Sequence, residues 1–187
     1  MGVIASAPAK VILFGEHFVV YGEPAIVTAI DKRAYAKVEL SQDKRLHIHS
    51  VNLNLAGYFE NGLFKVEQGG AKEARLKFEP LKLAVEKVQE IYGENVGLDV
   101  EVNSTVPVAA GLGSSAAVAA AVTAAVGALL KVKMSKEAVF RISYEAEKIV
   151  HGTPSEVGPA VSTFGGTLLF QMDTGFKPLD VKADVGA

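Results

Sequence analysis

The most constraining feature of this sequence is a run of small residues between Pro107 and Ala117. The run reads Pro-Val-Ala-Ala-Gly-Leu-Gly-Ser-Ser-Ala-Ala. It lies between a strand predicted at 97–103 and an apolar helix predicted at 115–130. Gly111 and Gly113 allow backbone conformations that other residues rarely adopt, and they allow close approach to a ligand. Because a helix start also leaves backbone N–H groups unpaired, the run predicts a phosphate-binding turn.

The spacing of these glycines matches neither a Walker A loop nor a Rossmann fingerprint. The hydroxyls of Ser114 and Ser115 follow directly. They can donate hydrogen bonds to a phosphate or bind Mg²⁺, a hard ion that prefers oxygen ligands. A pair of glycines alone would be weak evidence, but the flanking strand and the apolar helix make the signal more specific.

The rest of the chain shows strands first and then mainly helices. Hydrophobic patterns predict strands at 3–14, 25–40 (one strand or two), 45–51, 97–103 and 167–171. They predict helices at 78–92, 115–130 and 135–150, whereas 57–77 is rich in turn residues and weakly patterned. This order predicts the α+β class, and we expect residues 1–187 to form one domain.

Composition excludes several partners. The net charge of −2 offers no broad basic surface, so we expect neither nucleic acid nor an anionic membrane as a partner. The uncharged stretch 107–130 could span a bilayer by length, but its many Ala and Gly residues favour a buried helix. The absence of cysteine and of a visible signal peptide predicts a cytoplasmic location.

Two histidines, His47 and His49, lie on one face of the strand predicted at 45–51. This spacing could support a metal site, but no third type of ligand clusters nearby in the sequence. A solvent-exposed strand face is the favoured interpretation.

Three stretches resemble motifs of the GHMP kinase family, in the order in which the family has them. The run at 107–117 is similar to the motif that binds the phosphates of ATP. Ala7–His17, which reads Ala-Pro-Ala-Lys-Val-Ile-Leu-Phe-Gly-Glu-His, resembles the first motif. Its continuation, Phe18–Ile26, is similar to members that phosphorylate mevalonate. The third resemblance covers 145–155 together with 159–166.

The resemblance implies the amino-terminal ATP-binding domain of the family, a fold like domain 2 of ribosomal protein S5. It implies ATP and Mg²⁺ as cofactors and a mevalonate-like small molecule as the acceptor; a homodimer stays open. The glycine-rich motif of the family's carboxy-terminal domain has no counterpart here. We therefore expect that domain to be missing and the chain to be truncated.

Site residues follow from the same resemblance. Lys10 matches a lysine near the acceptor hydroxyl, where a cation would favour the alkoxide and neutralise phosphate charge. The substrate side is matched by Glu16, His17, Ser155 and Thr163. The nucleotide side is matched by Pro107, Ala109, Ala110, Gly111, Leu112, Gly113, Ser114, Ser115 and Ala116.

The metal ligands implied are Ser115, or its neighbour Ser114, together with Glu147. Glu145 is the other acidic residue on this predicted helix. On a helix the two glutamates point about 200° apart, so only one of them can face the site. The resemblance selects Glu147, and we expect Glu145 to be solvated.

The chain departs from the family at one position that bears on chemistry. The family has an aspartate three residues after the position of Ser155, and this chain has Gly158 there. That aspartate is implied to act as a general base or to fix the hydroxyl, and a positioned base gives on the order of 10²–10⁴ in rate. Glu156 could reach the same space if the loop is extended; otherwise it is an exposed loop glutamate.

Two alternatives to phosphorylation of mevalonate stay open. The first is a GHMP kinase for another alcohol, such as homoserine, galactose or a mevalonate phosphate. The second is a catalytically inactive fragment that only binds nucleotide, which Gly158 and the missing motif favour.

Overall fold

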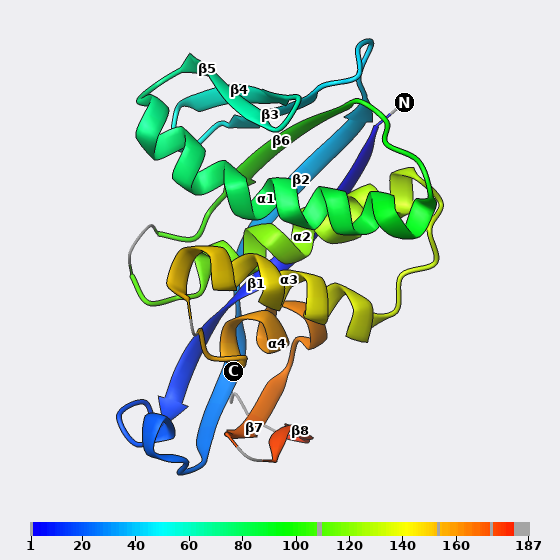
Figure 1. The fold of residues 1–187 in the computed structure, drawn as a ribbon. Helices are drawn as coiled ribbons and strands as arrows, with labels where there is room; N and C mark the ends of the chain where they lie inside the picture. Colours follow the sequence, from blue (N-terminus) through cyan, green and yellow to red (C-terminus); the bar gives the residue numbers. More distant parts are fainter. Residues whose placement is uncertain (1, 108–109, 153, 173, 182–187) are drawn as a thin grey trace, which may run out of the picture.

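The computed structural model describes residues 2–107, 110–152, 154–172 and 174–181 (Figure 1). Its strands are β1 (Val3–Phe14), β2 (Ala25–Leu40), β3 (Leu46–Ser50), β4 (Leu55–Glu60), β5 (Leu63–Gln68), β6 (Leu98–Ser104), β7 (Thr167–Gln171) and β8 (Gly175–Leu179). Its helices are the short 3₁₀ helix η1 (Val19–Tyr21), α1 (Ala71–Tyr92), α2 (Ser114–Leu129), α3 (Lys136–His151) and α4 (Val157–Phe164).

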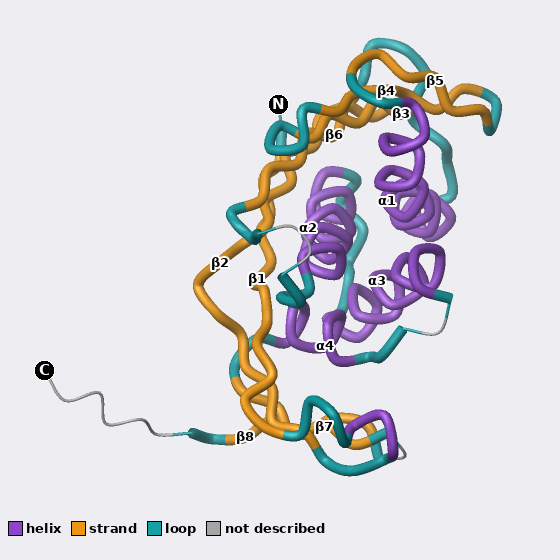
Figure 2. The backbone as a smooth tube through the Cα atoms, turned by 90° about the vertical axis from the view of Figure 1, so that its left-hand side faces the viewer, coloured by secondary structure: helices purple, strands orange, loops and turns teal. Residues whose placement is uncertain are grey.

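The described strands form one eight-stranded sheet. Its order is β5-β4-β3-β6-β2-β7-β8, and β1 pairs with β2. The pair β3 and β6 is parallel, and the other pairs are antiparallel. Figure 2 shows the four α-helices gathered on one side of the sheet. The α+β class is therefore confirmed.

Two hydrophobic clusters lie between the sheet and the helices. The larger one joins α1 and α2 to the middle of the sheet, with Phe78, Ile48 and Leu98 almost fully buried. The smaller one joins α4 to the ends of β2 and β7 through Val27, Val161 and other residues. Helix α2 is apolar nearly all round because the sheet and the other helices cover it. No described helix is both long and apolar enough to cross a bilayer.

Strand β2 contains an irregularity opposite β1. Ala9 pairs with Ile30, but Pro8 pairs with Arg33, so Asp31 and Lys32 have no partner on β1. Such a bulge bends and twists a strand locally. Residues 25–40 therefore form one continuous strand with a bulge, rather than two.

The prediction for 57–77 was incomplete. The segment contains most of the hairpin β4–β5 and the first two turns of α1. The hairpin turns at Asn61 and Gly62, whose φ angles of 50° and 77° suit a tight type I′ turn. Helix α1 continues through Pro80 and starts earlier than the predicted Phe78.

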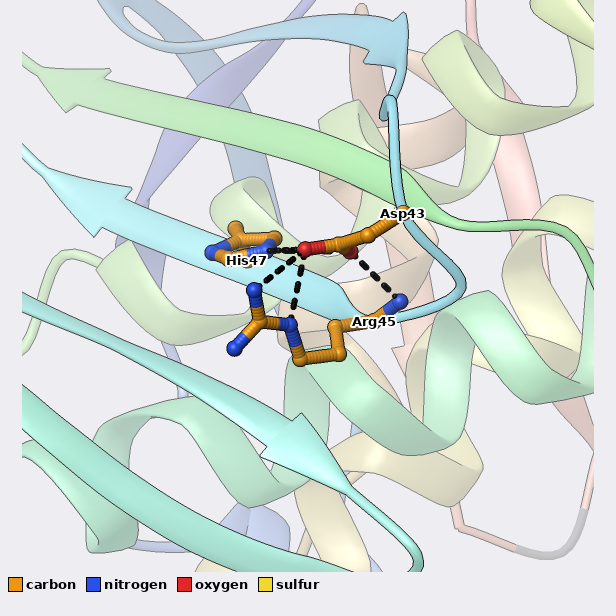
Figure 3. Close-up of polar contacts among 3 residues, drawn as sticks. All are labelled: Asp43, Arg45 and His47. Atoms are coloured by element: carbon orange, nitrogen blue, oxygen red, sulfur yellow. Dashed lines mark hydrogen bonds and ion pairs between the residues drawn. The ribbon is translucent and has the colours of Figure 1, made fainter.

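A polar cluster fixes the turn between β2 and β3 (Figure 3). The Asp43 carboxylate accepts hydrogen bonds from the backbone N–H of Arg45 at 2.8 Å and from its Nε at 2.7 Å. His47 Nε2 lies 3.3 Å from the same carboxylate. The bonds from Arg45 hold the pKa of Asp43 well below its usual range. His47 is thus partly buried against a carboxylate beside the turn.

Candidate functional site

A cavity of about 570 Å³ opens between the helices and the end of β6. Its lining comes from β1, the turn between β3 and β4, α1, β6, the start of α2, the end of α3 and the start of α4. One end is polar and contains Lys10, Ser114, Ser115 and Glu147. The part of the lining from α1, β6 and the β3–β4 turn contains the apolar residues Leu53, Leu76, Phe78, Pro80, Leu81 and Val102, together with the polar Ser50, Asn52, Lys77 and Ser104.

The glycine turn, residues 110–114, forms part of this lining. Gly111 and Gly113 have φ angles of 70° and 71°, in the left-handed region that favours glycine. Gly113 is the N-cap of α2 and has no side chain to cap it. Among the described residues, none accepts a hydrogen bond from the N–H groups of 114–116. The first turn of α2 therefore offers unpaired amides and the positive end of the helix dipole beside the cavity.

Lys10 lies against the glycine turn. Its backbone N–H donates a 3.0 Å hydrogen bond to the carbonyl of Leu112. A Cβ on Gly113 would lie 3.1 Å from Lys10 Cγ, so the lysine stem packs directly on this glycine. Burial lowers the pKa of the Lys10 ammonium, and the negative charge of Glu16 opposes that change. The cavity thus holds a partly desolvated cation next to unpaired amides.

The end of α3 brings Glu147 into the cavity. Glu147 is largely buried, and its carboxylate lies 3.8 Å from Nε2 of His151, one turn later on the helix. Glu145 instead pairs with Lys148 at 2.7 Å on the exposed side of the helix. Of the two glutamates, only Glu147 lines the same cavity as the hydroxyl-bearing residues Ser114 and Ser115.

Helix α4 begins beside the glycine turn. Gly158, in its first turn, and Ser155 both line the cavity. A Cβ on Gly158 would lie 3.2 Å from Ala116 Cβ, a tight contact that α2 or α4 would have to relieve by a small shift. Glu156 does not line the cavity, and its charge instead acts on Lys148. Position 158 therefore carries no carboxylate, and a side chain there would need α2 and α4 to move slightly apart.

The other residues predicted from the sequence differ in whether they line the cavity. Pro107 and Ala110 line it, Ala116 is buried behind it, and Ala109 lies outside the described residues. Glu16 and His17 are exposed in the turn after β1, outside the lining. Thr163 also lies outside it, on α4, and its buried Oγ1 finds no partner among the described residues.

Several lining residues were not predicted from the sequence. Ser50 is the last residue of β3, Asn52 and Leu53 come from the turn between β3 and β4, and Lys77 comes from α1. Their positions depend on the parallel pairing of β3 with β6, which places this turn beside the end of β6. His151 could have been found, because it follows Glu147 by one helical turn.

Comparisons with known proteins agree with this geometry. Residues 79–166 match the family model described as GHMP kinases N terminal domain. A mevalonate kinase from Pyrococcus furiosus is 43% identical over 178 residues, which cover 91% of this chain and 52% of that protein. The chain thus spans about half the length of the curated relatives that it matches.

Solved structures show the same fold. The Methanococcus jannaschii mevalonate kinase has a TM-score of 0.80 at 24% identity, and the match covers 97% of this chain and 56% of that one. The L. major mevalonate kinase in complex with R-mevalonate has a TM-score of 0.74 at 25% identity, and the match covers 96% of this chain and 53% of that one. Residues 79–166 therefore match the GHMP kinase N-terminal domain, and nearly the whole chain is similar to the amino-terminal part of mevalonate kinases.

Proposed function

We propose that this chain provides the nucleotide-binding part of a kinase that transfers the γ-phosphoryl group of ATP to the primary hydroxyl of mevalonate, forming 5-phosphomevalonate. The observation that carries the proposal is the open first turn of α2, whose amides adjoin the cavity beside Lys10. Relatives named mevalonate kinase, up to 43% identical, support the choice of acceptor.

The cavity suits a nucleotide in size and in polarity. Its volume of about 570 Å³ falls within the usual range of small-molecule sites. We place the phosphates at the glycine turn, where Ser114 and Ser115 add hydroxyl donors. The purine then lies at the other end, against Phe78 and Leu81 of α1. Pro107, Ala110 and Leu112 line the space between the two ends, and Ala109 and Ala116 belong to the same sequence motif.

The oxygen groups at the polar end fit Mg²⁺. Glu147 supplies a carboxylate and Ser115 or Ser114 a hydroxyl, which are hard oxygen ligands, and phosphate oxygens complete such sites. When bound, the ion would neutralise charge on the transferring phosphoryl group. Few protein ligands are needed, because Mg²⁺ commonly keeps water and substrate oxygens.

Lys10 is the residue that we place at the acceptor hydroxyl. Its ammonium would stabilise the developing alkoxide and the transferred phosphoryl group. Gly158 supplies no base, so transfer would depend on positioning and electrostatics. We assign the substrate side to Ser155, and to Glu16, His17 and Thr163 if the acceptor extends beyond the cavity. A cytoplasmic location and a homodimer stay predictions, as does a single domain over residues 1–187.

The test combines binding with turnover. Calorimetric titration of the chain with ATP and Mg²⁺ should show one site. A fusion to the remaining half of the Pyrococcus furiosus relative should convert mevalonate to its phosphate, detected by mass spectrometry. Lys10→Met should abolish turnover, while Lys65→Met, at an exposed position on β5, should not. Absence of nucleotide binding in both proteins would refute the proposal.

A second candidate is nucleotide binding without phosphoryl transfer, which Gly158 favours. In that case the fusion would bind ATP with Mg²⁺ but would turn over no alcohol. A panel containing homoserine, galactose and a mevalonate phosphate separates this outcome from a kinase with another acceptor.

A further inference from the structure

A buried hydroxyl faces the cavity without a partner in the described part of the chain. Ser50, the last residue of β3, is 3% exposed and lines the cavity. Three other buried hydroxyls, those of Thr123, Ser143 and Ser162, each donate a hydrogen bond of 2.7–2.9 Å to a backbone carbonyl. The Ser50 Oγ forms no such bond with any described residue. Because buried polar groups are normally paired, this open hydroxyl points to a ligand that completes it.

The sheet fixes where this hydroxyl points. Ser50 pairs with Leu55 of β4 on one side and with Val102 of β6 on the other. Alternate residues of a strand share a face, so Ser50 lies on the same face as Ile48, which is almost fully buried beneath the helices. A serine therefore occupies a position on the core side of the sheet, and its side chain faces the cavity.

The nearest polar groups of the lining already have partners. Asn52 Oδ1 accepts a 3.2 Å hydrogen bond from the backbone N–H of Ser104. The Ser104 Oγ in turn accepts a 3.1 Å hydrogen bond from the N–H of Val106. These bonds hold the β3–β4 turn against the end of β6. Ser50 differs from both residues because its hydroxyl can still donate one hydrogen bond and accept another.

We propose that Ser50 determines which purine nucleotides the cavity binds, through a hydrogen bond between its hydroxyl and the group at position 6 of the purine ring. The inference rests on the proposed nucleotide site, in which the purine lies against Phe78 and Leu81, in the part of the lining that contains Ser50. A hydroxyl accepts from the 6-amino group of adenine and donates to the 6-oxo group of hypoxanthine equally well. The cavity therefore binds both purines and disfavours one that carries only hydrogen at position 6.

The test measures affinity, without turnover, by calorimetric titration of the chain with Mg²⁺ and each of three nucleotides. These are ATP, inosine triphosphate and purine riboside triphosphate, which has no polar group at position 6. The first two should bind within about threefold of each other and the third about fivefold more weakly, since one hydrogen bond contributes about that much.

Variants of Ser50 assign the difference to its hydroxyl. Ser50→Ala should weaken binding of ATP and inosine triphosphate about fivefold and leave purine riboside triphosphate unchanged. Ser50→Cys keeps the size of the side chain but is a weak hydrogen-bonding partner, so it should behave in the same way. Ser143→Ala is the matched control. It removes a buried hydroxyl that bonds to Val139 within α3, outside the cavity lining, and should leave the ratios of the three affinities unchanged.

The outcomes separate this inference from the proposed function. An equal loss for all three nucleotides in both Ser50 variants overturns the inference, because the hydroxyl would then support the fold or contact the ribose. It is also overturned if the parent chain binds ATP and purine riboside triphosphate equally well. A parent chain that binds none of the three nucleotides refutes the nucleotide site itself, and this inference with it.

Discussion

The backbone N–H of Lys10 and the carbonyl of Leu112 form a 3.0 Å hydrogen bond between β1 and the glycine turn. This bond holds β1 and the glycine turn, which are far apart in the sequence, in one position relative to each other. The same contact places the lysine stem on Gly113, where no side chain could fit without a shift. The cation and the unpaired amides of α2 are therefore positioned together.

We expect Gly113→Ala to weaken binding of ATP with Mg²⁺ by more than it weakens the fold. Alanine at φ 71° costs about 1–2 kcal/mol, and its methyl group would also displace Lys10. Gly62→Ala is the matched control, with φ 77° and no described atom within 4 Å of the added Cβ. Calorimetric titration and thermal unfolding of both variants make the comparison. Equal affinity in the two variants would contradict a role of Gly113 in phosphate binding.

Lys10 should react with an amine-directed reagent at lower pH than surface lysines do. Burial lowers its pKa in the folded protein, so the neutral amine is present at a pH where exposed lysines are still charged. The sign for stability follows. Below the pKa of Lys10 in the folded protein, the buried charge lowers the free energy of unfolding. This loss of stability disappears as pH rises from that pKa to the higher pKa of the unfolded chain.

Trinitrobenzenesulfonate labelling with peptide mapping, from pH 7 to 10, measures this difference. Lys65, exposed on β5, is the internal reference. ATP with Mg²⁺ should protect Lys10 and leave Lys65 unchanged. Identical pH profiles for the two lysines would show that burial does not affect Lys10.

Gly158→Asp should raise the turnover of the fused kinase by about two orders of magnitude, the usual contribution of a positioned base. The new Cβ would lie 3.2 Å from Ala116 Cβ, so α2 and α4 must move apart by a few tenths of an ångström to accept it. A carboxylate in the first turn of α4 should also stabilise the fold slightly through the helix dipole. Gly158→Asn, with similar shape and no charge, is the control. An equal rise with asparagine would argue for shape rather than for acid–base chemistry.

Asp43→Asn should flatten the loss of stability in acid. The pKa of Asp43 is lower in the folded protein than in the unfolded chain, mainly because Arg45 donates hydrogen bonds to its carboxylate. Its contribution is present above the unfolded pKa of about 3.9 and is lost as pH falls through that value and below. Unfolding midpoints from pH 6 to 2 should therefore fall more steeply in the parent chain. Asp31→Asn, at an exposed position, should follow the parent.

Much of the architecture was predictable because its signals are local. Helix α2 follows from an uninterrupted apolar run, and helix α3 from its Ser135 cap, whose hydroxyl accepts a hydrogen bond from the N–H of Ala138 at 3.1 Å. The hairpin β4–β5 was missed although Asn61-Gly62 is a known hairpin signal. Helix α4 was missed because Gly158 and Pro159 suggest a loop, whereas burial of Val157, Ala160 and Val161 stabilises the helix.

The site was predictable only in its polar half. Lys10, the glycine turn and Glu147 belong to recognisable motifs, and they line one cavity. Leu53, Phe78 and Val102 carry no such pattern, because they come together only through tertiary packing of α1 on the sheet. The roles of Glu16, His17 and Thr163 stay predictions.

The bulge at Asp31 and Lys32 lies opposite the residues of β1 that directly precede Lys10. It faces Pro8 and Ala9, and a bulge of this kind bends and twists the strands locally. Removing both residues would allow regular pairing of β1 with β2 there, so we expect the bend of the strands beside Lys10 to change. The backbone beside Lys10 thus depends on an insertion of two exposed residues that do not line the cavity.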